Sequence, residues 1–106
     1  MSNPPKNVLE RIRNDIVYNP ETGDLTWVEG RRKGYPAGSL DTFNNYTAVS
    51  IGPRKYAASH IAWYLHHGEW PGRSRIIFSN GDATDLSARN MTLRPLSDTP
   101  KAAYAR

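Results

Sequence analysis

The sequence predicts an α+β fold, with an N-terminal helix, a small antiparallel sheet or hairpin, a central apolar helix and a C-terminal unit of strand, turn and helix. Apolar residues recur at helical spacing near the N-terminus and again over residues 59–67, and short β-rich runs bounded by turn residues lie between them. A chain of 106 residues has the size of one domain. We therefore expect a single domain over residues 1–106, with a flexible arm at 1–6 and a frayed tail at 96–106.

The first half of the chain is predicted to contain a helix and then strands. Asn7 can cap the helix, whose apolar stripe is Val8, Leu9, Ile12 and Ile16. Turn formers at 18–24 precede a strand that begins near Leu25. After them we expect a polar loop at 29–34, a turn at 41–45, and a hairpin that joins strand 46–51 to residues 56–58 through Gly52-Pro53-Arg54-Lys55.

The second half is predicted to begin with the apolar helix, capped by Ser59 and ended by Gly68 and Pro71. Ile76-Ile77-Phe78 has the composition of an inner strand, and Asn80-Gly81 is a turn signal. A second, polar helix is expected from Ala83 to Leu93, with Asp85 or Ser87 near its start.

The chain has no cysteine, so a disulfide framework and a thiolate zinc site are both excluded. The N-terminus lacks an apolar signal core, and no segment approaches the roughly 20 apolar residues of a membrane span. These features favour a cytoplasmic protein without a membrane partner.

Positive charge is concentrated in the middle of the chain. The formal net charge is +4, and residues 30–80 hold seven basic and two acidic residues. A local excess of this kind attracts polyanions, although a merely solvated basic surface is the other interpretation. The candidate nucleic-acid-binding residues are Arg31, Arg32, Lys33, Arg54, Lys55, Arg73 and Arg75, with the interleaved aromatics Tyr35, Tyr56 and Trp70. Such rings can stack on unpaired bases or can belong to the core.

The order of motifs from about Tyr18 to Arg94 resembles the small phage-borne HNH homing-endonuclease family. Its pieces are Tyr18-Asn19-Pro20-Glu21-Thr22-Gly23 before a Leu-x-Trp strand, Ala37-Gly38, the hairpin, the Ala62-Trp63 helix ending in Gly68-Glu69-Trp70-Pro71, Asn80-Gly81-Asp82, and Asn90 before Leu93-Arg94. The resemblance implies a ββα-metal unit at the C-terminus. In that family an Asp and an Asn hold a divalent cation, a His deprotonates water and a second Asn orients the His.

When the positions of the family's metal site are matched to this chain one by one, only one of the four keeps the family's residue type. Ile77 stands at the Asp position, Phe78 at the His position and Leu86 at the middle Asn position, and only the final Asn is present, as Asn90. Hydrocarbon side chains supply neither a metal ligand nor a base. We therefore expect no enzymatic activity, no catalytic residue, no metal and no cofactor.

Two other polar groups could be mistaken for metal sites. His60 and His67 are seven residues apart and could share a helical face with His66 beside them, but no carboxylate accompanies them. Asn80, Asp82 and Asp85 fit turn and cap roles.

The basic clusters predict a non-enzymatic nucleic-acid-binding protein. The resemblance implies that it is encoded by a phage and derived from an HNH endonuclease that has lost its active site. It would occupy single- or double-stranded DNA and so block a host defence nuclease. One alternative is a phage inhibitor of the anti-CRISPR or anti-defence type that binds a host protein directly. A second alternative is an active HNH nuclease whose metal site has moved.

Overall fold

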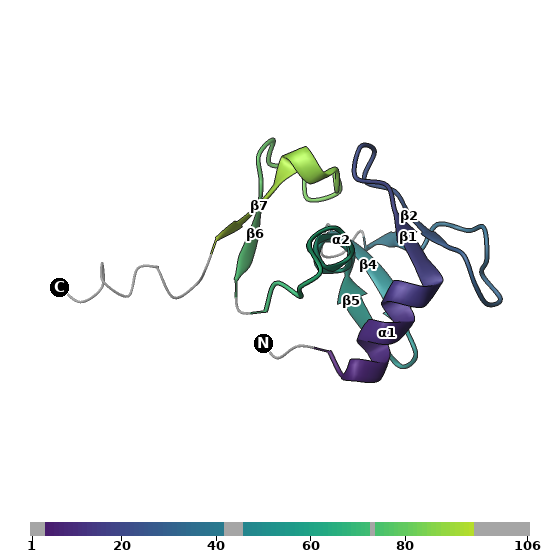
Figure 1. The fold of residues 1–106 in the computed structure, drawn as a ribbon. Coiled ribbons are helices and arrows are strands. Elements are labelled where there is room, and N and C mark those ends of the chain that lie inside the picture. Colours follow the sequence, from purple (N-terminus) through teal and green to yellow (C-terminus); the bar gives the residue numbers. More distant parts are fainter. Residues whose placement is uncertain (1–3, 42–45, 73, 95–106) are drawn as a thin grey trace.

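The fold is that of a computed structural model, which describes residues 4–41, 46–72 and 74–94. It is α+β, with two helices and small antiparallel sheets (Figure 1). Helix α1 (Lys6–Asp15) starts directly after Pro5, whose carbonyl accepts the N–H groups of Val8 and Leu9 at 3.0 and 3.1 Å. The predictions of an Asn7 cap and of an arm reaching residue 6 are therefore wrong, because the helix begins at Lys6 with Pro5 as its N-cap.

Strand β1 (Ile16–Tyr18) follows α1 without a linker and pairs antiparallel with β2 (Leu25–Trp27). Ile16 was expected on the helix stripe, but it lies opposite Trp27 in this ribbon. Both side chains are only 2% exposed. The helical and the extended conformation both bury Ile16, and the pairing with β2 decides between them.

The middle sheet has the order β3-β4-β5, formed by β3 (Ser39–Asp41), β4 (Tyr46–Ile51) and β5 (Arg54–Ala57). The predicted hairpin is confirmed as β4 and β5, joined by Gly52 and Pro53, with Gly52 at φ +64°. Strand β5 starts at Arg54, two residues before the predicted strand. The short β3 was missed because its composition resembles a turn, and residues 42–45 of the predicted turn lie outside the described residues.

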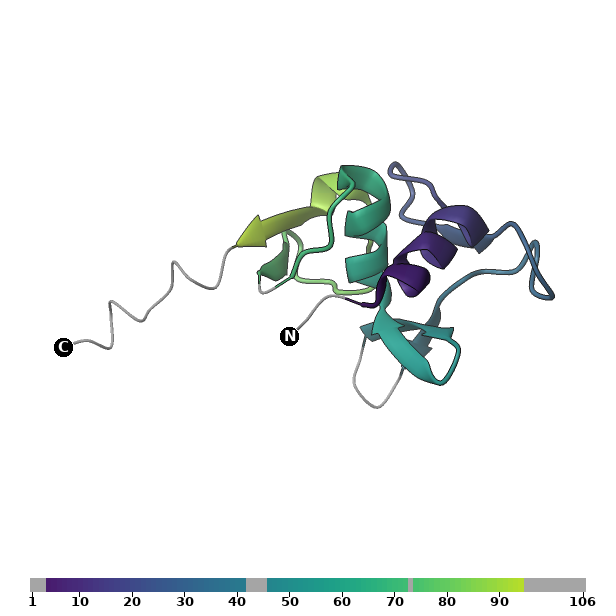
Figure 2. The same cartoon turned by 60° about the horizontal axis from the view of Figure 1, so that its bottom comes forward.

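Helix α2 (Ala58–His67) continues directly from β5, with Ala57 at the N-cap and no side-chain cap. The prediction of Ser59 as the cap is wrong, because the strand runs into the helix without a polar linker residue. The helix ends at Gly68, which adopts the left-handed conformation at φ +85°, as expected. In Figures 1 and 2, α2 lies between α1 and the ribbon of strands β6 (Arg75–Phe78) and β7 (Met91–Arg94). It contacts α1, β1, β4 and β5.

The C-terminal unit differs from its prediction. Residues 83–93 are not an α-helix, since a loop leads to the single 3₁₀ turn η1 (Ala88–Asn90) and then to β7. Two sets of hydrogen bonds disfavour an α-helix at residues 83–93. Polar side chains of the loop bond to nearby backbone N–H groups, and Met91–Arg94 pairs antiparallel with β6. The predicted tail at 96–106 lies outside the described residues.

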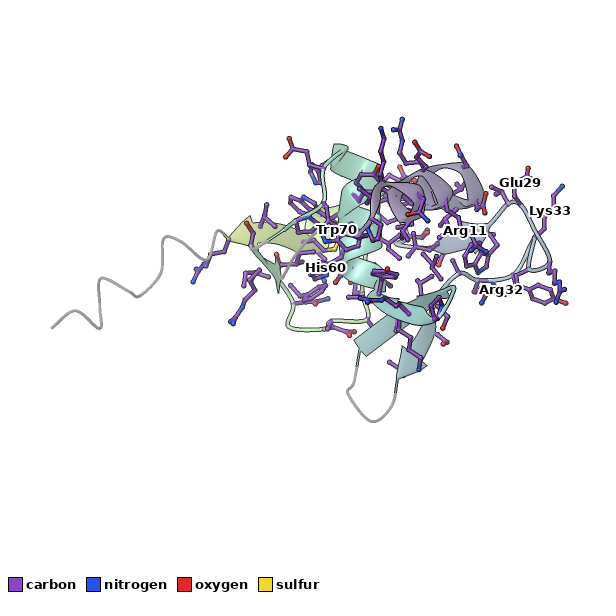
Figure 3. The ribbon with its side chains drawn as sticks, turned by 90° about the horizontal axis from the view of Figure 1, so that it is seen from below. Arg11, Glu29, Arg32, Lys33, His60 and Trp70 are labelled. Carbon is purple, nitrogen blue, oxygen red and sulfur yellow. The ribbon has the colours of Figure 1, made fainter. Side chains whose placement is uncertain are left out.

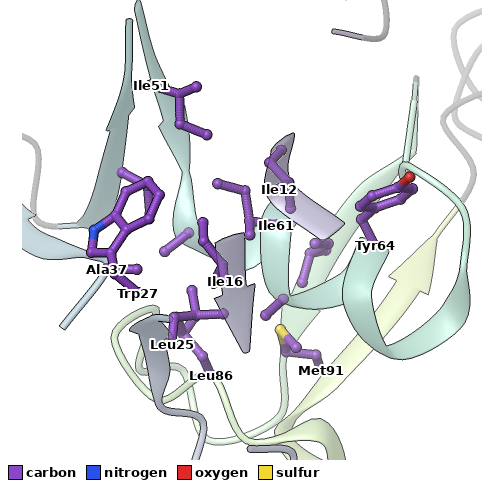
Figure 4. Close-up of a cluster of buried hydrophobic side chains, with 14 residues drawn as sticks. Ile12, Ile16, Leu25, Trp27, Ala37, Ile51, Ile61, Tyr64, Leu86 and Met91 are labelled. Carbon is purple, nitrogen blue, oxygen red and sulfur yellow. The ribbon is translucent and has the colours of Figure 1, made fainter. Parts of the chain in front are cut away.

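One buried cluster joins these elements (Figure 4). Ile12 and Ile61 are fully buried at the contact of the two helices, and Val49 is fully buried from β4. The C-terminal unit contributes Ile76, Leu86 and Met91, each at most 8% exposed. None of the helices in the described part of the chain has the length and apolar character needed to cross a membrane.

Candidate nucleic-acid interface

The basic loop, residues 28–35, is closed by backbone hydrogen bonds that join Trp27 to Gly34 and Tyr35. Trp27 donates to the Tyr35 carbonyl at 3.0 Å, and Gly34 donates to the Trp27 carbonyl at 2.8 Å. Within the loop, Lys33 donates to Gly30 at 3.2 Å. The loop is therefore held in a defined conformation after β2, and Arg31, Arg32, Lys33 and Tyr35 are all exposed. Figure 3 labels Arg32 and Lys33 in this loop.

Arg32 connects the basic loop to the middle sheet. Its guanidinium carbon lies 4.6 Å from the centre of the Trp27 ring, and its Nη2 donates to the Ser50 carbonyl at 3.1 Å. Ser50 is the register partner of Lys55, and Arg54 lies opposite Ile51 at the end of the same hairpin. Both basic residues of β5 are exposed.

The hydrogen bond from Arg32 to the Ser50 carbonyl joins the loop with the first predicted cluster of cations to the hairpin with the second. We define the basic face as Arg31, Arg32 and Lys33 of the loop together with Arg54 and Lys55 of the hairpin. Sequence reasoning identified all five as cations, but it did not detect the role of Arg32 as the link between them. The signal in the sequence for this link is the spacing of Trp27 and Arg32, which lie five residues apart, with Arg32 between Gly30 and Gly34.

Of the two remaining predicted cations, the structure describes Arg75. Arg75 is exposed at the start of β6, on the other side of α2 from the basic loop (Figures 1 and 3). Arg73 lies outside the described residues. The structure therefore does not bring Arg75 into the basic face.

The three predicted aromatics have different environments. Tyr35 is 65% exposed beside the cations of the loop. Tyr56 and Trp70 are half-buried and meet edge to face, with ring centroids 6.2 Å apart and planes at 86°. Trp70 also lies 5.6 Å from His60 and 6.2 Å from Tyr64, and both Tyr56 and Trp70 pack against the core cluster. Tyr35 is thus the ring most accessible to an unpaired base.

The four positions that correspond to the metal site of the resembled family contribute to the fold. Leu86 is 5% exposed in the core, Phe78 packs against the core, and Ile77 is half-buried on β6. Asn90 is 5% exposed, and its side chain is already bonded. Its Oδ1 accepts the N–H of Asn80 at 3.0 Å, and its Nδ2 donates to the Asp85 carbonyl at 2.9 Å.

Asn90 thereby holds together the acidic loop, residues 79–87. Within this loop Asp82 accepts the hydroxyl and the N–H of Thr84, and these bonds lower the pKa of Asp82. Asp85 accepts the hydroxyl and N–H of Ser87, which likewise lowers its pKa. The predicted turn role of Asp82 is confirmed, and the predicted helix-cap role of Asp85 is wrong because no α-helix follows it in the described residues.

The acidic loop is docked onto the turn between β1 and β2. The Tyr18 hydroxyl donates to the Leu86 carbonyl at 2.6 Å, and the Ala88 N–H donates to the Pro20 carbonyl at 2.8 Å. Burial raises the pKa of Tyr18, and the Asp85 carboxylate raises it further. Gly23 faces the loop so closely that a Cβ there would lie 2.7 Å from backbone atoms of Leu86 and Ser87.

The histidines are distributed along α2. The Nδ1 atom of His60 is buried without a hydrogen-bond partner among the described residues, and burial lowers the pKa of this imidazole. His66 and His67 are exposed at the end of the helix, where His67 stacks on Trp63 with centroids 3.8 Å apart. Burial, followed by the neighbouring His66, lowers the pKa of His67. In the described ranges, three or more His, Cys, Asp or Glu residues nowhere converge as they would around a metal ion.

No family model, curated protein or solved structure matches this chain.

Proposed function

We propose that this protein binds nucleic acid without cutting it, and that the basic face is the surface that holds the DNA. The observation that carries the proposal is the position of Arg32, which pins the basic loop to the β4–β5 hairpin. Arg31, Lys33, Arg54 and Lys55 are then exposed on two adjoining elements, with Arg54 and Lys55 on opposite sides of β5. Cations gathered in this way neutralise neighbouring phosphates of one backbone and release their counterions.

The second part of the proposal is that the scaffold descends from a phage HNH endonuclease that has lost its active site. The support is the order of motifs together with the use of the four metal-site positions. A buried Leu86 and a Phe78 packed on the core offer no ligand or base, and the amide of Asn90 is occupied by loop backbone. A chain that keeps a basic face and has hydrocarbon at these positions can act by occupying DNA and so excluding a host defence nuclease.

A protein partner is the second candidate function. It is favoured by two large exposed side chains, Tyr35 at 65% and Leu40 at 51%, which lie on the basic loop and on the nearby strand β3. Tyrosine and arginine are enriched at protein interfaces. In this case the basic face would meet an acidic surface of a host defence protein.

Titration of a labelled duplex and of a labelled single strand over a range of salt concentrations tests the proposal. The four exposed cations Arg31, Lys33, Arg54 and Lys55 predict a slope of log Kobs against log salt of about −3 to −4 on duplex DNA, and a somewhat shallower slope on a single strand. The protein should leave both substrates intact in Mg²⁺ or Mn²⁺. Absence of binding at low salt would contradict the proposal and favour the protein partner.

A further inference from the structure

The β6–β7 ribbon has one face that the core does not use. In its register Ile76 pairs with Leu93 and Phe78 with Met91, and these four side chains lie on the face that packs against the core. Because side chains alternate along a strand, the other face carries Arg75, Arg94, Ile77 and Thr92. Arg75, Arg94 and Thr92 are exposed, and Ile77 is half-buried. The outer face of the ribbon therefore has two guanidiniums and a hydroxyl.

Arg75 and Arg94 are directly opposite each other in this ribbon. Like charges at opposite positions of two strands repel, so the pair is unfavourable unless an anion lies between or above the two guanidiniums. Among the described residues, the ion pair is that of Arg11 and Asp15 on α1. Neither Arg75 nor Arg94 forms an ion pair with a carboxylate of the described residues. Forked guanidiniums beside a hydroxyl are groups that commonly bind phosphate oxygens.

The ribbon and the basic face are on different sides of the molecule. In Figures 1 and 3 the ribbon lies on one side of α2, and the loop that carries Arg32 and Lys33 lies on the other side, beyond β1 and β2. A phosphate backbone bound along the basic face is therefore a different segment from one that contacts the ribbon.

We propose that the outer face of the β6–β7 ribbon is a second nucleic-acid-binding surface, so that one molecule holds two segments of DNA. This inference rests on the proposed function, which supplies the first segment at the basic face. The product of such binding is a bridge between two duplexes, or between two distant parts of one molecule. A protein that occupies DNA in this way would compact it as well as cover it.

A capture assay tests the bridge. One biotinylated duplex is fixed to beads, a fluorescent duplex of unrelated sequence is added, and the fluorescence retained by the protein is measured at low salt. We expect retention with the native protein and at least a tenfold loss with Arg75→Gln/Arg94→Gln. The same variant should bind a single duplex in solution within about twofold of the native affinity. Lys6→Gln/Arg13→Gln, which removes two exposed charges from α1, is the matched control and should retain capture.

The outcomes separate the two proposals. Binding of single duplexes without capture, or capture that persists in Arg75→Gln/Arg94→Gln, overturns the second surface and leaves the proposed function in place. Equal weakening of single-duplex binding in that variant also overturns it, because both surfaces would then contact one segment. Failure of the native protein to bind any duplex contradicts the proposed function and removes the basis of the bridge. Circular dichroism checks that the variant is folded, which we expect because the substitution removes a like-charge contact.

Discussion

The basic loop and the acidic loop use their polar side chains in opposite ways. In the acidic loop, Asn80, Asp82 and Asp85 all accept backbone N–H groups within two residues of themselves, and Asn90 closes the loop from behind. In the basic loop, Arg31 and Lys33 are exposed, and Arg32 alone among the three consecutive cations contacts the rest of the fold in the described structure. The comparison distinguishes polar residues that build a fold from polar residues left available to a partner.

Two glycines with the same backbone conformation provide the strongest test of this difference. Gly23 and Gly30 both have φ +86°, so alanine at either site costs about 1–2 kcal/mol in backbone strain. Only Gly23 faces the acidic loop at 2.7 Å, whereas a Cβ on Gly30 meets no heavy atom of the described chain within 4 Å. Gly23→Ala should therefore cost about 1–3 kcal/mol more than Gly30→Ala in urea unfolding. Equal losses would show that the acidic loop is not docked onto the turn between β1 and β2 as described.

Asn90→Ala should have the next largest effect, because it removes both hydrogen bonds of a buried amide. The Asn80 N–H and the Asp85 carbonyl would each lose a partner. We expect a loss of about 2–3 kcal/mol in the free energy of unfolding, measured by urea denaturation. Asn14→Ala, at an exposed position on α1, is the matched control and should change stability little. Stability unchanged by Asn90→Ala would mean that the acidic loop does not depend on this side chain.

A smaller effect is expected at Arg32. Arg32→Met keeps part of the apolar stem but removes the cation above Trp27 and the donor to Ser50, at a cost of about 0.5–1.5 kcal/mol. The neighbouring Arg31→Met removes an equal charge from the same loop and should leave stability unchanged. Thermal unfolding of both variants measures the difference. A destabilisation of equal size in both variants would contradict the role of Arg32 as the link.

The smallest effect is a pH dependence that originates at His60. Its pKa is lowered in the folded state by burial, so the unfolded chain binds more protons below about pH 6.5. Stability should therefore fall as the pH decreases from 7 through 6.5 toward the folded pKa. In His60→Gln the decrease should be smaller, while His67, whose pKa is also lowered, retains its own contribution. An identical pH profile in the two proteins, recorded by urea unfolding, would show that His60 does not titrate with folding.

Local signals in the sequence predicted much of the fold but not the way its parts meet. Gly52-Pro53 predicted the hairpin, and Gly68 predicted the end of α2, because both depend on the conformation of a few residues. The helix predicted at 83–93 failed because Asp82 and Asp85 bond to backbone N–H groups two residues ahead, and because Met91 pairs with distant Phe78.

The candidate site shows the same division. The cations of the basic face could be found from the sequence, because Arg and Lys are almost never fully buried unless they are paired. Their assembly could not be found, because it depends on the contact between Arg32 and Ser50, which are 18 residues apart. The pairing of Arg75 with Arg94 could not be predicted either, because it requires β7, and the sequence predicted a helix that ends next to Arg94.

The salt dependence of DNA binding in paired variants tests most directly whether the basic face is one nucleic-acid-binding surface. We would measure fluorescence anisotropy of a labelled duplex with the native protein, Arg31→Gln/Lys33→Gln, Arg54→Gln/Lys55→Gln and the control Lys6→Gln/Arg13→Gln. Each face variant should reduce the slope of log Kobs against log salt by about two units, and the combined variant by nearly four, with the control unchanged. Slopes and affinities that stay at the native values in both face variants would contradict the account.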